Sequence, residues 1–280
     1  MTTGRVALVT GASSGIGKAT AVALQQAGFS VYATARSSDD LKQLEQLTLH
    51  AVELDVTDDR QATSRIREIE KSHGHIDVLV NNAGYSLQQP IETAEPAAVR
   101  RQFETNVFAP ARLSQLVLPA MRSHGNGRII NVGSMGGRFT LPGGGYYHAT
   151  KHALEAISDA LRLEVASFGV KVILIQPGPV QSEFGRAAVD SMTDEGASDG
   201  PYAPFMRELQ RAMEGSYDGL AGRFDATAGD VARVIVRAAT TAHPRPRYAV
   251  GATARMLITG RRLLPDQLWD AAVRRIWPTP

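Results

Sequence analysis

Short apolar runs alternate with longer amphipathic stretches along most of this chain. The runs are rich in Val, Ile and Leu, which is typical of strands buried on both faces of a sheet. The stretches between them repeat their apolar residues every three or four positions, which predicts helices. We expect strands at residues 5–10, 30–35, 49–54, 76–80, 127–134, 170–176 and 247–250, with a long helix over 96–121 and another from Tyr147 to Phe168.

This alternation predicts an α/β fold. Strands that alternate with helices form a parallel sheet with right-handed crossovers, and the helices cover both faces. We therefore expect one doubly wound, Rossmann-type domain of about seven strands over residues 1–280. Residues 183–226 interrupt the pattern with glycines and large apolar residues, and we expect them to form an irregular substrate lid. Residues 252–280 form a C-terminal tail.

The tail carries an apolar stripe. Pro265 and Asp266 predict the start of a helix, whose apolar positions are Leu268, Trp269, Ala272, Val273 and Ile276. The stripe leaves three partners open: the protein's own core or a second subunit, the wall of a substrate cleft, and a membrane. The membrane interpretation depends on four nearby arginines, Arg261, Arg262, Arg274 and Arg275. We favour the protein, because so short a helix binds bilayers weakly.

Composition narrows the kinds of chemistry that are available. The chain has no cysteine and its seven histidines show no ligand spacing, so we expect neither disulfides nor a metal site. Its 30 basic and 28 acidic residues give no electrostatic case for binding nucleic acid. No signal segment precedes the first strand and no uncharged run is long enough to span a membrane, so we expect a cytoplasmic protein.

A glycine-rich turn follows the first strand and leads into the first helix. It comprises Gly11, Ser13, Ser14, Gly15, Ile16 and Gly17. Glycines let the backbone approach a ligand closely, and a helix N-terminus presents unpaired N–H groups to a phosphate. The spacing departs from the usual Gly-x-Gly-x-x-Gly, and a glycine-rich turn alone is often only a turn. Its position at the first strand–helix junction favours a pyrophosphate site.

Arg36 follows the second strand at the place that faces the adenosine ribose in dinucleotide folds. A carboxylate there would bind the 2′-hydroxyl of NAD, whereas a guanidinium would pair with a 2′-phosphate. The strand ends in Ala35 and Arg36 with no acidic residue, which favours NADP(H). The alternative is a solvated loop arginine with no ligand.

Tyr147 and Lys151 stand four positions apart in a predicted helix, so they share one face. A nearby ammonium favours the phenolate and makes tyrosine a usable general acid and base at neutral pH. Ser134 ends a buried strand, where its hydroxyl could hold the same substrate oxygen. Tyr146 is the rival phenol, but it has no cation four positions on, so we assign it to packing or to lining a pocket.

Together these motifs resemble the short-chain dehydrogenase/reductase family over nearly the whole chain. The motifs occur in the family's order: the glycine turn, Asn81-Asn82-Ala83-Gly84 after the fourth strand, Ser134, and Tyr147 with Lys151. The resemblance implies that Asn106 completes the catalytic set and bonds through water toward Lys151. It also implies further cofactor contacts by Asp55 and Val56 at the adenine, by Asn82, Ala83 and Gly84, and by Pro177, Gly178, Val180 and Ser182 near the nicotinamide.

The resemblance implies an NADP(H)-dependent oxidoreductase that transfers a hydride between the nicotinamide and a ketone or secondary alcohol. We expect an apolar substrate and a homo-oligomer, a dimer or a tetramer. Two alternatives remain. One is a non-catalytic NADP(H)-binding regulatory protein on the same fold, which an intact set of Ser134, Tyr147, Lys151 and Asn106 disfavours. The other is a nucleotide-sugar epimerase, which the chain length and the glycine spacing disfavour. Neither the substrate nor the direction of the reaction follows from the sequence.

Overall fold

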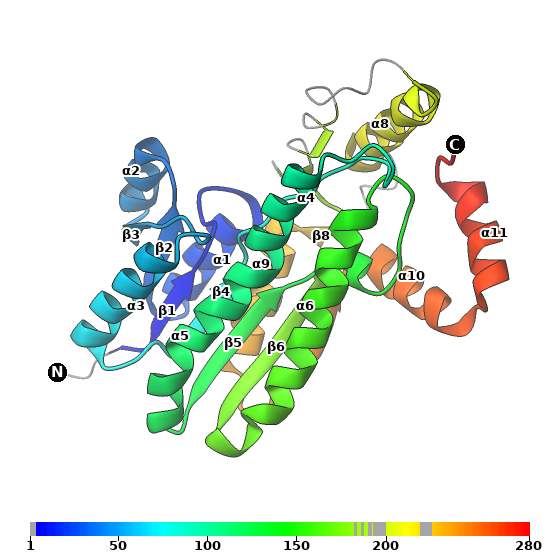
Figure 1. Ribbon diagram of the computed structural model, residues 1–280. Helices are drawn as coiled ribbons and strands as arrows, with labels where there is room; N and C mark the ends of the chain where they lie inside the picture. Colours follow the sequence, from blue (N-terminus) through cyan, green and yellow to red (C-terminus); the bar gives the residue numbers. More distant parts are fainter. Residues whose placement is uncertain (1–3, 182–183, 186–187, 190–191, 193–199, 219–225) are drawn as a thin grey trace.

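A parallel sheet of seven strands forms the centre of the computed structural model, which describes residues 4–181, 184–185, 188–189, 192, 200–218 and 226–280. The strand order is β3-β2-β1-β4-β5-β6-β9 (Figure 1). The strands are β1 (Val6–Val9), β2 (Ser30–Ala35), β3 (His50–Glu53), β4 (Val78–Asn81), β5 (Gly127–Val132), β6 (Val170–Pro177) and β9 (Arg247–Val250). The predicted doubly wound fold is thereby confirmed.

Two layers of helices cover the sheet. One face carries α1 (Gly15–Gln26), α2 (Ser38–Gln46) and α9 (Ala228–Thr240); the other carries α3 (Asp59–His73), α5 (Ala109–Ser123) and α6 (Gly145–Glu164). Alternate residues of a strand serve opposite layers because successive side chains point to opposite faces. In β1, Ala7 and Val9 pack with α1 and α9, whereas Val6 and Leu8 pack with α3 and α5.

The strand order reverses at β1, which pairs with β2 on one side and with β4 on the other. In open α/β sheets, such a reversal leaves a crevice at the carboxyl ends of the strands, because the following loops diverge to opposite faces. The turn after β1 and the segment after β4 therefore meet at one edge of the sheet, where the sequence predicts the ligand.

The long helix predicted over 96–121 is divided in three. It consists of α4 (Pro96–Phe103), a π-helical turn η1 (Glu104–Phe108) and α5. A π turn inserts one residue without stopping the helix, so the apolar periodicity continues on either side and hides it from sequence analysis. Asn106 lies in this turn and is buried. The prediction of one continuous helix was therefore wrong at its middle.

Part of the predicted lid is regular. Residues Ala203–Asp218 form α8, whose buried side chains Phe205, Met206, Leu209 and Met213 gather with Ala188 and Met192. The expectation of an irregular segment was therefore wrong for these residues. A second, two-stranded sheet joins β7 (Val180–Gln181) to β8 (Ala226–Thr227) beside it. The rest of residues 183–226 lies largely outside the described residues.

The tail forms two helices, α10 (Ala252–Leu263) and α11 (Asp266–Ile276), which stand beside the sheet rather than in either layer (Figure 1). The predicted helix start at Asp266 is confirmed. Trp269 and Val273 are buried, whereas Leu268 and Ile276 are 57% and 65% exposed, so the predicted stripe is covered only in part. Among the helices of the described ranges, none combines the length and apolarity that crossing a bilayer requires.

Candidate active site

A cleft of about 1660 Å³ opens at the carboxyl ends of β1, β4, β5 and β6. Most of the residues singled out in the sequence line it: Gly11, Ser13, Ser14, Gly15, Ile16, Arg36, Asp55, Val56, Asn82, Ala83, Gly84, Ser134, Tyr147, Lys151, Pro177, Gly178 and Val180. Gly17 and Asn106 are not among the lining residues, and Ser182 lies outside the described residues. The structure thus brings together residues from stretches spread between Gly11 and Val180 in the sequence.

The glycines after β1 make a turn that a larger residue could not form. Gly11 and Gly15 have φ angles of +61° and +51°, in the left-handed region that favours glycine. A Cβ on Gly17 would stand 2.1 Å from the carbonyl oxygen of Gly11, so the first turn of α1 packs directly on this loop. Gly17 therefore shapes the turn from behind, and its contact with the cofactor stays a prediction.

The first turn of α1 fits a phosphate. Its N-cap residue, Ser14, makes no side-chain capping bond, and the turn contains no acidic residue. Its backbone N–H groups are therefore left to a ligand, and the positive end of the helix dipole faces the cleft. The donors at this helix end suit the pyrophosphate of a dinucleotide.

Asn82 and Thr10 hold the glycine turn against the end of β4. The Asn82 amide nitrogen donates to the carbonyl oxygens of Thr10 and Gly11, both at 3.0 Å. The Thr10 hydroxyl in turn accepts from the backbone N–H groups of Asn82 and Ala83, at 3.0 and 3.1 Å. Sequence analysis placed Asn82 in the site but gave Thr10 no role, because a strand-end threonine has no distinctive local signal.

Arg36 is exposed at the edge of the cleft, beyond β2. The positive charge of Arg36 acts on the Asp55 carboxyl at the end of the cleft where the adenosine of a dinucleotide would lie. Burial alone would raise the pKa of the Asp55 carboxyl, but the hydrogen bonds from Thr57 and the charge of Arg36 lower it below its usual value. Asp55 therefore stays ionised, and Arg36 is the cation that remains available to a phosphate at this end.

Ser134, Tyr147 and Lys151 converge at the middle of the cleft. Ser134 follows β5 and its Oγ accepts a hydrogen bond from the Gly136 N–H at 3.0 Å, which leaves its hydroxyl hydrogen for another acceptor. Tyr147 and Lys151 lie one turn apart near the start of α6, with the Lys151 Nζ 5.8 Å from the centre of the Tyr147 ring. Ser134 and Tyr147 thus line one cleft, with the Lys151 ammonium beside the Tyr147 ring.

Lys151 is buried, and its Nζ donates to the Val132 carbonyl oxygen at 3.0 Å. Burial lowers the pKa of its ammonium from 10.5 to about 8, because desolvation disfavours the charged form. Lys151 is nonetheless mostly protonated at neutral pH, and its other two donors can serve a ligand.

Asn106 anchors this part of the site. Its Nδ2 donates to the Tyr85 carbonyl oxygen at 2.9 Å and to the Thr150 hydroxyl at 3.1 Å. Its Oδ1 accepts from the Tyr85 N–H at 3.1 Å. Both side-chain donors are therefore occupied, so the water link from Asn106 toward Lys151, which stays a prediction, would use an acceptor of Asn106.

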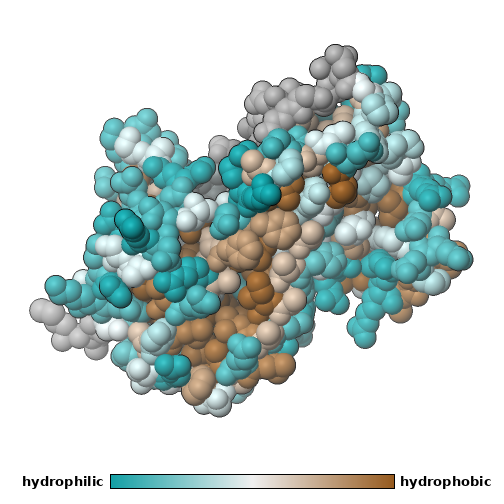
Figure 2. All heavy atoms as spheres, viewed as in Figure 1, coloured by the Kyte–Doolittle hydropathy of each residue, from teal (hydrophilic) through white to brown (hydrophobic). Residues whose placement is uncertain are grey.

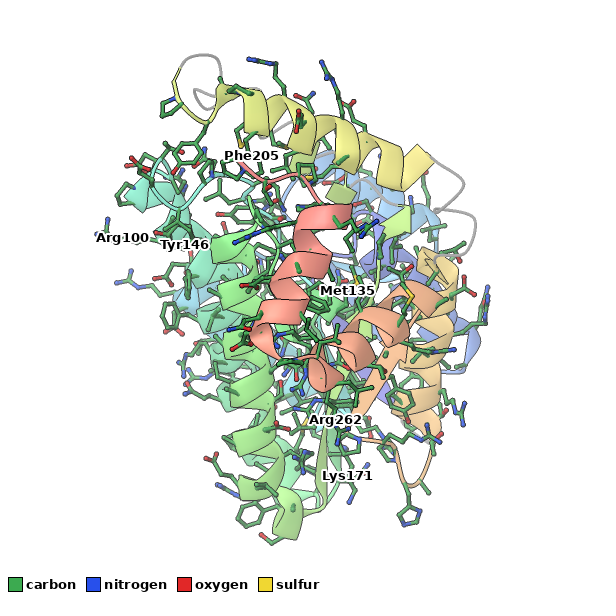
Figure 3. All side chains as sticks on the ribbon, turned by 90° about the vertical axis from the view of Figure 1, so that its right-hand side faces the viewer. Arg100, Met135, Tyr146, Lys171, Phe205 and Arg262 are labelled. Carbon is green, nitrogen blue, oxygen red and sulfur yellow. The ribbon has the colours of Figure 1, made fainter. Side chains whose placement is uncertain are left out.

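The two neighbouring tyrosines occupy different places. Tyr147 lines the cleft and Tyr146 does not. Figure 3 shows Tyr146 on the side of α6 next to α4, whereas Met135 lies behind the tail helices at the cleft. This arrangement matches the interpretation of Tyr146 as a packing residue.

The far end of the cleft is apolar and is built partly by the tail. Phe139, Trp269 and Val273 form a buried cluster there, and Trp277 packs against both this cluster and the apolar cluster of α8. The Trp277 Nε1 donates to the Pro142 carbonyl oxygen at 3.2 Å. Sequence analysis did not identify Phe139, His148 and Trp277, all of which line the cleft.

A doubly wound sheet with a glycine turn at its first crossover and a Ser-Tyr-Lys set in the same cleft defines a class, the dinucleotide-dependent oxidoreductases. Comparisons with known proteins identify the family within this class. The family model for short chain dehydrogenases matches residues 5–193, which is more than half of the chain. The protein belongs to the short chain dehydrogenase family.

Curated relatives and solved structures agree with this assignment. The chain is 34% identical over 271 residues to the probable short-chain type dehydrogenase/reductase VdlC of Helicobacter pylori, and covers 97% of each chain. It is 34% identical over 275 residues to the NADPH-dependent 3-dehydrocapnine reductase of Ornithobacterium rhinotracheale, with 95% of each covered. A short-chain dehydrogenase structure from Streptomyces avermitilis superposes with a TM-score of 0.79 at 33% identity, covering 96% of this chain and 95% of the other.

Proposed function

We propose that the protein is an NADP(H)-dependent oxidoreductase that interconverts a ketone and a secondary alcohol bearing apolar groups. Three observations support this. The helix N-terminus at Gly15 suits a pyrophosphate, and Arg36 at the adenosine end suits a 2′-phosphate. The apolar wall of Phe139, Trp269 and Val273 suits hydrocarbon next to the reacting carbon. The relative from Ornithobacterium rhinotracheale is itself NADPH-dependent.

When bound, the nicotinamide supplies or accepts the hydride. The chain's own residues hold the substrate oxygen and transfer the proton. The Ser134 hydroxyl donates a hydrogen bond to the substrate oxygen and holds it in place, while the Tyr147 hydroxyl gives its proton to that oxygen in reduction and takes it back in oxidation. The positive charge of Lys151, 5.8 Å from the ring, stabilises the phenolate that Tyr147 becomes.

In this mechanism Asn106 and Thr150 position Tyr147. The Thr150 hydroxyl donates to the Tyr147 carbonyl oxygen at 2.7 Å and accepts from Asn106. These bonds tie the first turn of α6 to the π turn and to Tyr85. They fix the direction in which Tyr147 enters the cleft, on which proton transfer depends.

The observation that carries the proposal is that Ser134, Tyr147 and Lys151 line the same cleft as the glycine turn. The test is a panel of ketones and secondary alcohols of increasing chain length, with NADPH or NADP⁺ consumption followed by absorbance. We expect turnover that improves with chain length. Cofactor binding by calorimetry without turnover of any member would favour a regulatory, non-catalytic protein instead.

Two further expectations, on the cellular location and on the assembly of the protein, also belong to the proposal. We place the enzyme in the cytoplasm, which fractionation of cells expressing a tagged copy would test.

We also propose that a second copy of the chain covers the side of the sheet that carries α5 and α6, where Phe108, Leu163 and Phe168 are exposed at 55%, 69% and 42%. Figure 2 shows apolar side chains across this face. Light scattering of the wild type and of Leu163→Glu would reveal whether the assembly exists and uses this surface.

A further inference from the structure

A second cavity, of about 460 Å³, adjoins the apolar end of the cleft. Its volume is within the range of small-molecule sites. Four residues line both spaces: Leu141, Pro142, Trp269 and Val273. A residue that lines two spaces stands between them, so these four residues form a thin partition. The cleft therefore ends at this partition, with further space behind it, and not at the solid interior of the protein.

The indole of Trp269 stands across the partition. On one side it packs against Phe139, with the ring centres 5.4 Å apart, and Phe139 lines the cleft but not the second cavity. On the other side the Arg261 guanidinium lies 5.8 Å from the indole centre, and Arg261 lines the second cavity but not the cleft. The indole therefore divides the two spaces, and only 8% of Trp269 is exposed.

The contacts of the indole hold it in this position. Arg261 is itself anchored, because its Nη2 donates to Asp266 at 2.6 Å and its Nη1 donates to the Leu264 carbonyl oxygen at 3.3 Å. A guanidinium this close to an aromatic ring stabilises it, and so does a second ring at the distance of Phe139. Displacing the indole would lose both contacts, so the partition is closed in the ground state of the protein.

A row of rings leads from the reacting centre to the partition. Consecutive ring centres are 5.7, 6.2 and 5.4 Å apart along the series Tyr147, His148, Phe139 and Trp269. All four residues line the cleft. Burial lowers the pKa of His148 from 6.5 to about 4, so its ring is uncharged at neutral pH and suits an apolar path. A hydrocarbon arm that starts at the reacting carbon and follows these rings ends at the indole.

We propose that Trp269 sets the greatest length of the apolar arm that a substrate of this enzyme can carry. The inference rests on the proposed function and narrows its substrate class to ketones and secondary alcohols with an apolar arm of limited length. The arm ends in an uncharged group, because Phe139, Trp269 and Val273 form an apolar cluster there and a charge would be buried without a partner. A longer arm would have to displace the indole.

Four variants test the partition. Trp269→Ala removes the indole and joins the cleft to the second cavity, whereas Trp269→Phe keeps a ring in place. Thr140→Trp, added to Trp269→Ala, fills the second cavity again from a residue that lines that cavity and not the cleft. Leu268→Ala is the matched control, because Leu268 is the exposed neighbour of Trp269 on α11 and lines neither space.

The experiment measures kcat/KM with NADPH for the unbranched methyl ketones from hexan-2-one to hexadecan-2-one. Each methylene that the cleft buries should raise kcat/KM by up to roughly 4-fold. In the wild type and in Leu268→Ala we expect this rise to stop at one chain length, beyond which kcat/KM is level or falls. In Trp269→Ala the rise should continue to longer chains. Trp269→Phe should stay close to the wild-type limit, and Thr140→Trp should restore a limit to Trp269→Ala.

Binding separates this inference from the proposed function. The same ketones are titrated by calorimetry in the presence of NADP⁺, which cannot reduce them. A limit in affinity that moves to longer chains in Trp269→Ala would uphold the inference even if no ketone were reduced. If circular dichroism shows that Trp269→Ala is unfolded, Val273→Ala, which thins the same partition, should move the limit in the same direction. Reduction of the ketones with one and the same limit in the wild type and in these variants would overturn the inference and leave the proposed function intact.

Discussion

The Lys151 ammonium lies 5.8 Å from the centre of the Tyr147 ring, one helical turn away on α6, and is tied to the end of β5 through the Val132 carbonyl oxygen. The helix supplies the spacing and the strand fixes the direction of the lysine. A charge and a phenol are thereby held together, and because Lys151 is buried their interaction is stronger than it would be at the surface.

Tyr147→Phe should lose roughly 10²- to 10⁴-fold in kcat, because it keeps the ring and removes the proton that the substrate oxygen needs. The affinity for the cofactor should not change. Stopped-flow or steady-state assays with the best ketone of the panel measure the effect. Tyr146→Phe is the control and should stay active, since Tyr146 does not line the cleft. Retention of more than about a tenth of wild-type kcat by Tyr147→Phe would contradict the assignment.

Lys151 should make the folded protein more stable as the pH rises above 8. Its pKa is about 8 in the fold, and an unfolded lysine has a pKa near 10.5. Between these values the unfolded chain binds the proton and the folded chain does not, so the free energy of unfolding rises with pH by up to about 3 kcal/mol. Below pH 8 both states are protonated and the folded state bears the full cost of burying the charge.

Denaturant unfolding of the cofactor-free wild type and of Lys151→Met, from pH 7 to pH 10.5, isolates this effect. The variant has no ammonium, so the difference in unfolding free energy between the two proteins should shift in favour of the wild type across this range. A difference that does not change with pH would show that Lys151 is not desolvated as described.

Arg36→Ala should lose most of the preference for NADPH over NADH. A charge-assisted hydrogen bond to a 2′-phosphate contributes about 1.5–3 kcal/mol, or roughly 10- to 150-fold in kcat/KM. The ratio of kcat/KM for the two cofactors measures it. Arg67→Ala, which changes an exposed arginine of α3 outside the cleft, should leave the ratio unchanged. Equal use of both cofactors by the wild type would refute the role of Arg36.

Trp277→Ala should raise KM for long-chain ketones and have little effect on short ones. The ring closes the apolar end of the cleft and is fixed by its bond to Pro142. The truncation removes apolar contact with a long substrate that contributes about 1–2 kcal/mol to its binding free energy, or roughly 5- to 30-fold in affinity. Leu268→Ala is the matched control, because Leu268 is exposed on α11 and does not line the cleft. An equal loss for short and long ketones would place Trp277 outside the substrate site.

The intact protein should not bind anionic vesicles at physiological salt. Trp269, the aromatic residue of α11, is buried against Phe139 with their ring centres 5.4 Å apart, so it is not available to a bilayer. Vesicle sedimentation checks this. Co-sedimentation would show that the exposed Leu268 and Ile276, together with the neighbouring arginines, suffice for membrane binding.

The predictable parts of the fold are those in which local pattern and final structure agree. The strands at 30–35 and 247–250 lie where the alternation of apolar runs and helices predicted them. The cleft follows too, because parallel strands end at one edge. The π turn that places Asn106 beside its partners could not be read from the apolar periodicity, which continues on either side of it.

The parts that could not be predicted depend on contacts distant in sequence. The tautomer of His148 is set by the carbonyl oxygen of Gly136, on a separate turn. The anchor of Trp277 is Pro142, 135 positions earlier in the chain. A stripe of apolar residues predicted that the tail needs a partner, but not that Trp269 and Val273 would be covered while Leu268 and Ile276 are not.

The hydroxyl of Thr10 accepts from two backbone amides and donates to the Val80 carbonyl oxygen, at 3.3 Å, so its bonding capacity is fully used. The floor of the cleft is therefore ordered before any dinucleotide arrives. A preorganised floor spares the binding step the conformational entropy that a disordered loop would lose. The amides of Asn82 and Ala83 should accordingly exchange slowly with deuterium in the cofactor-free protein, although they lie outside regular secondary structure.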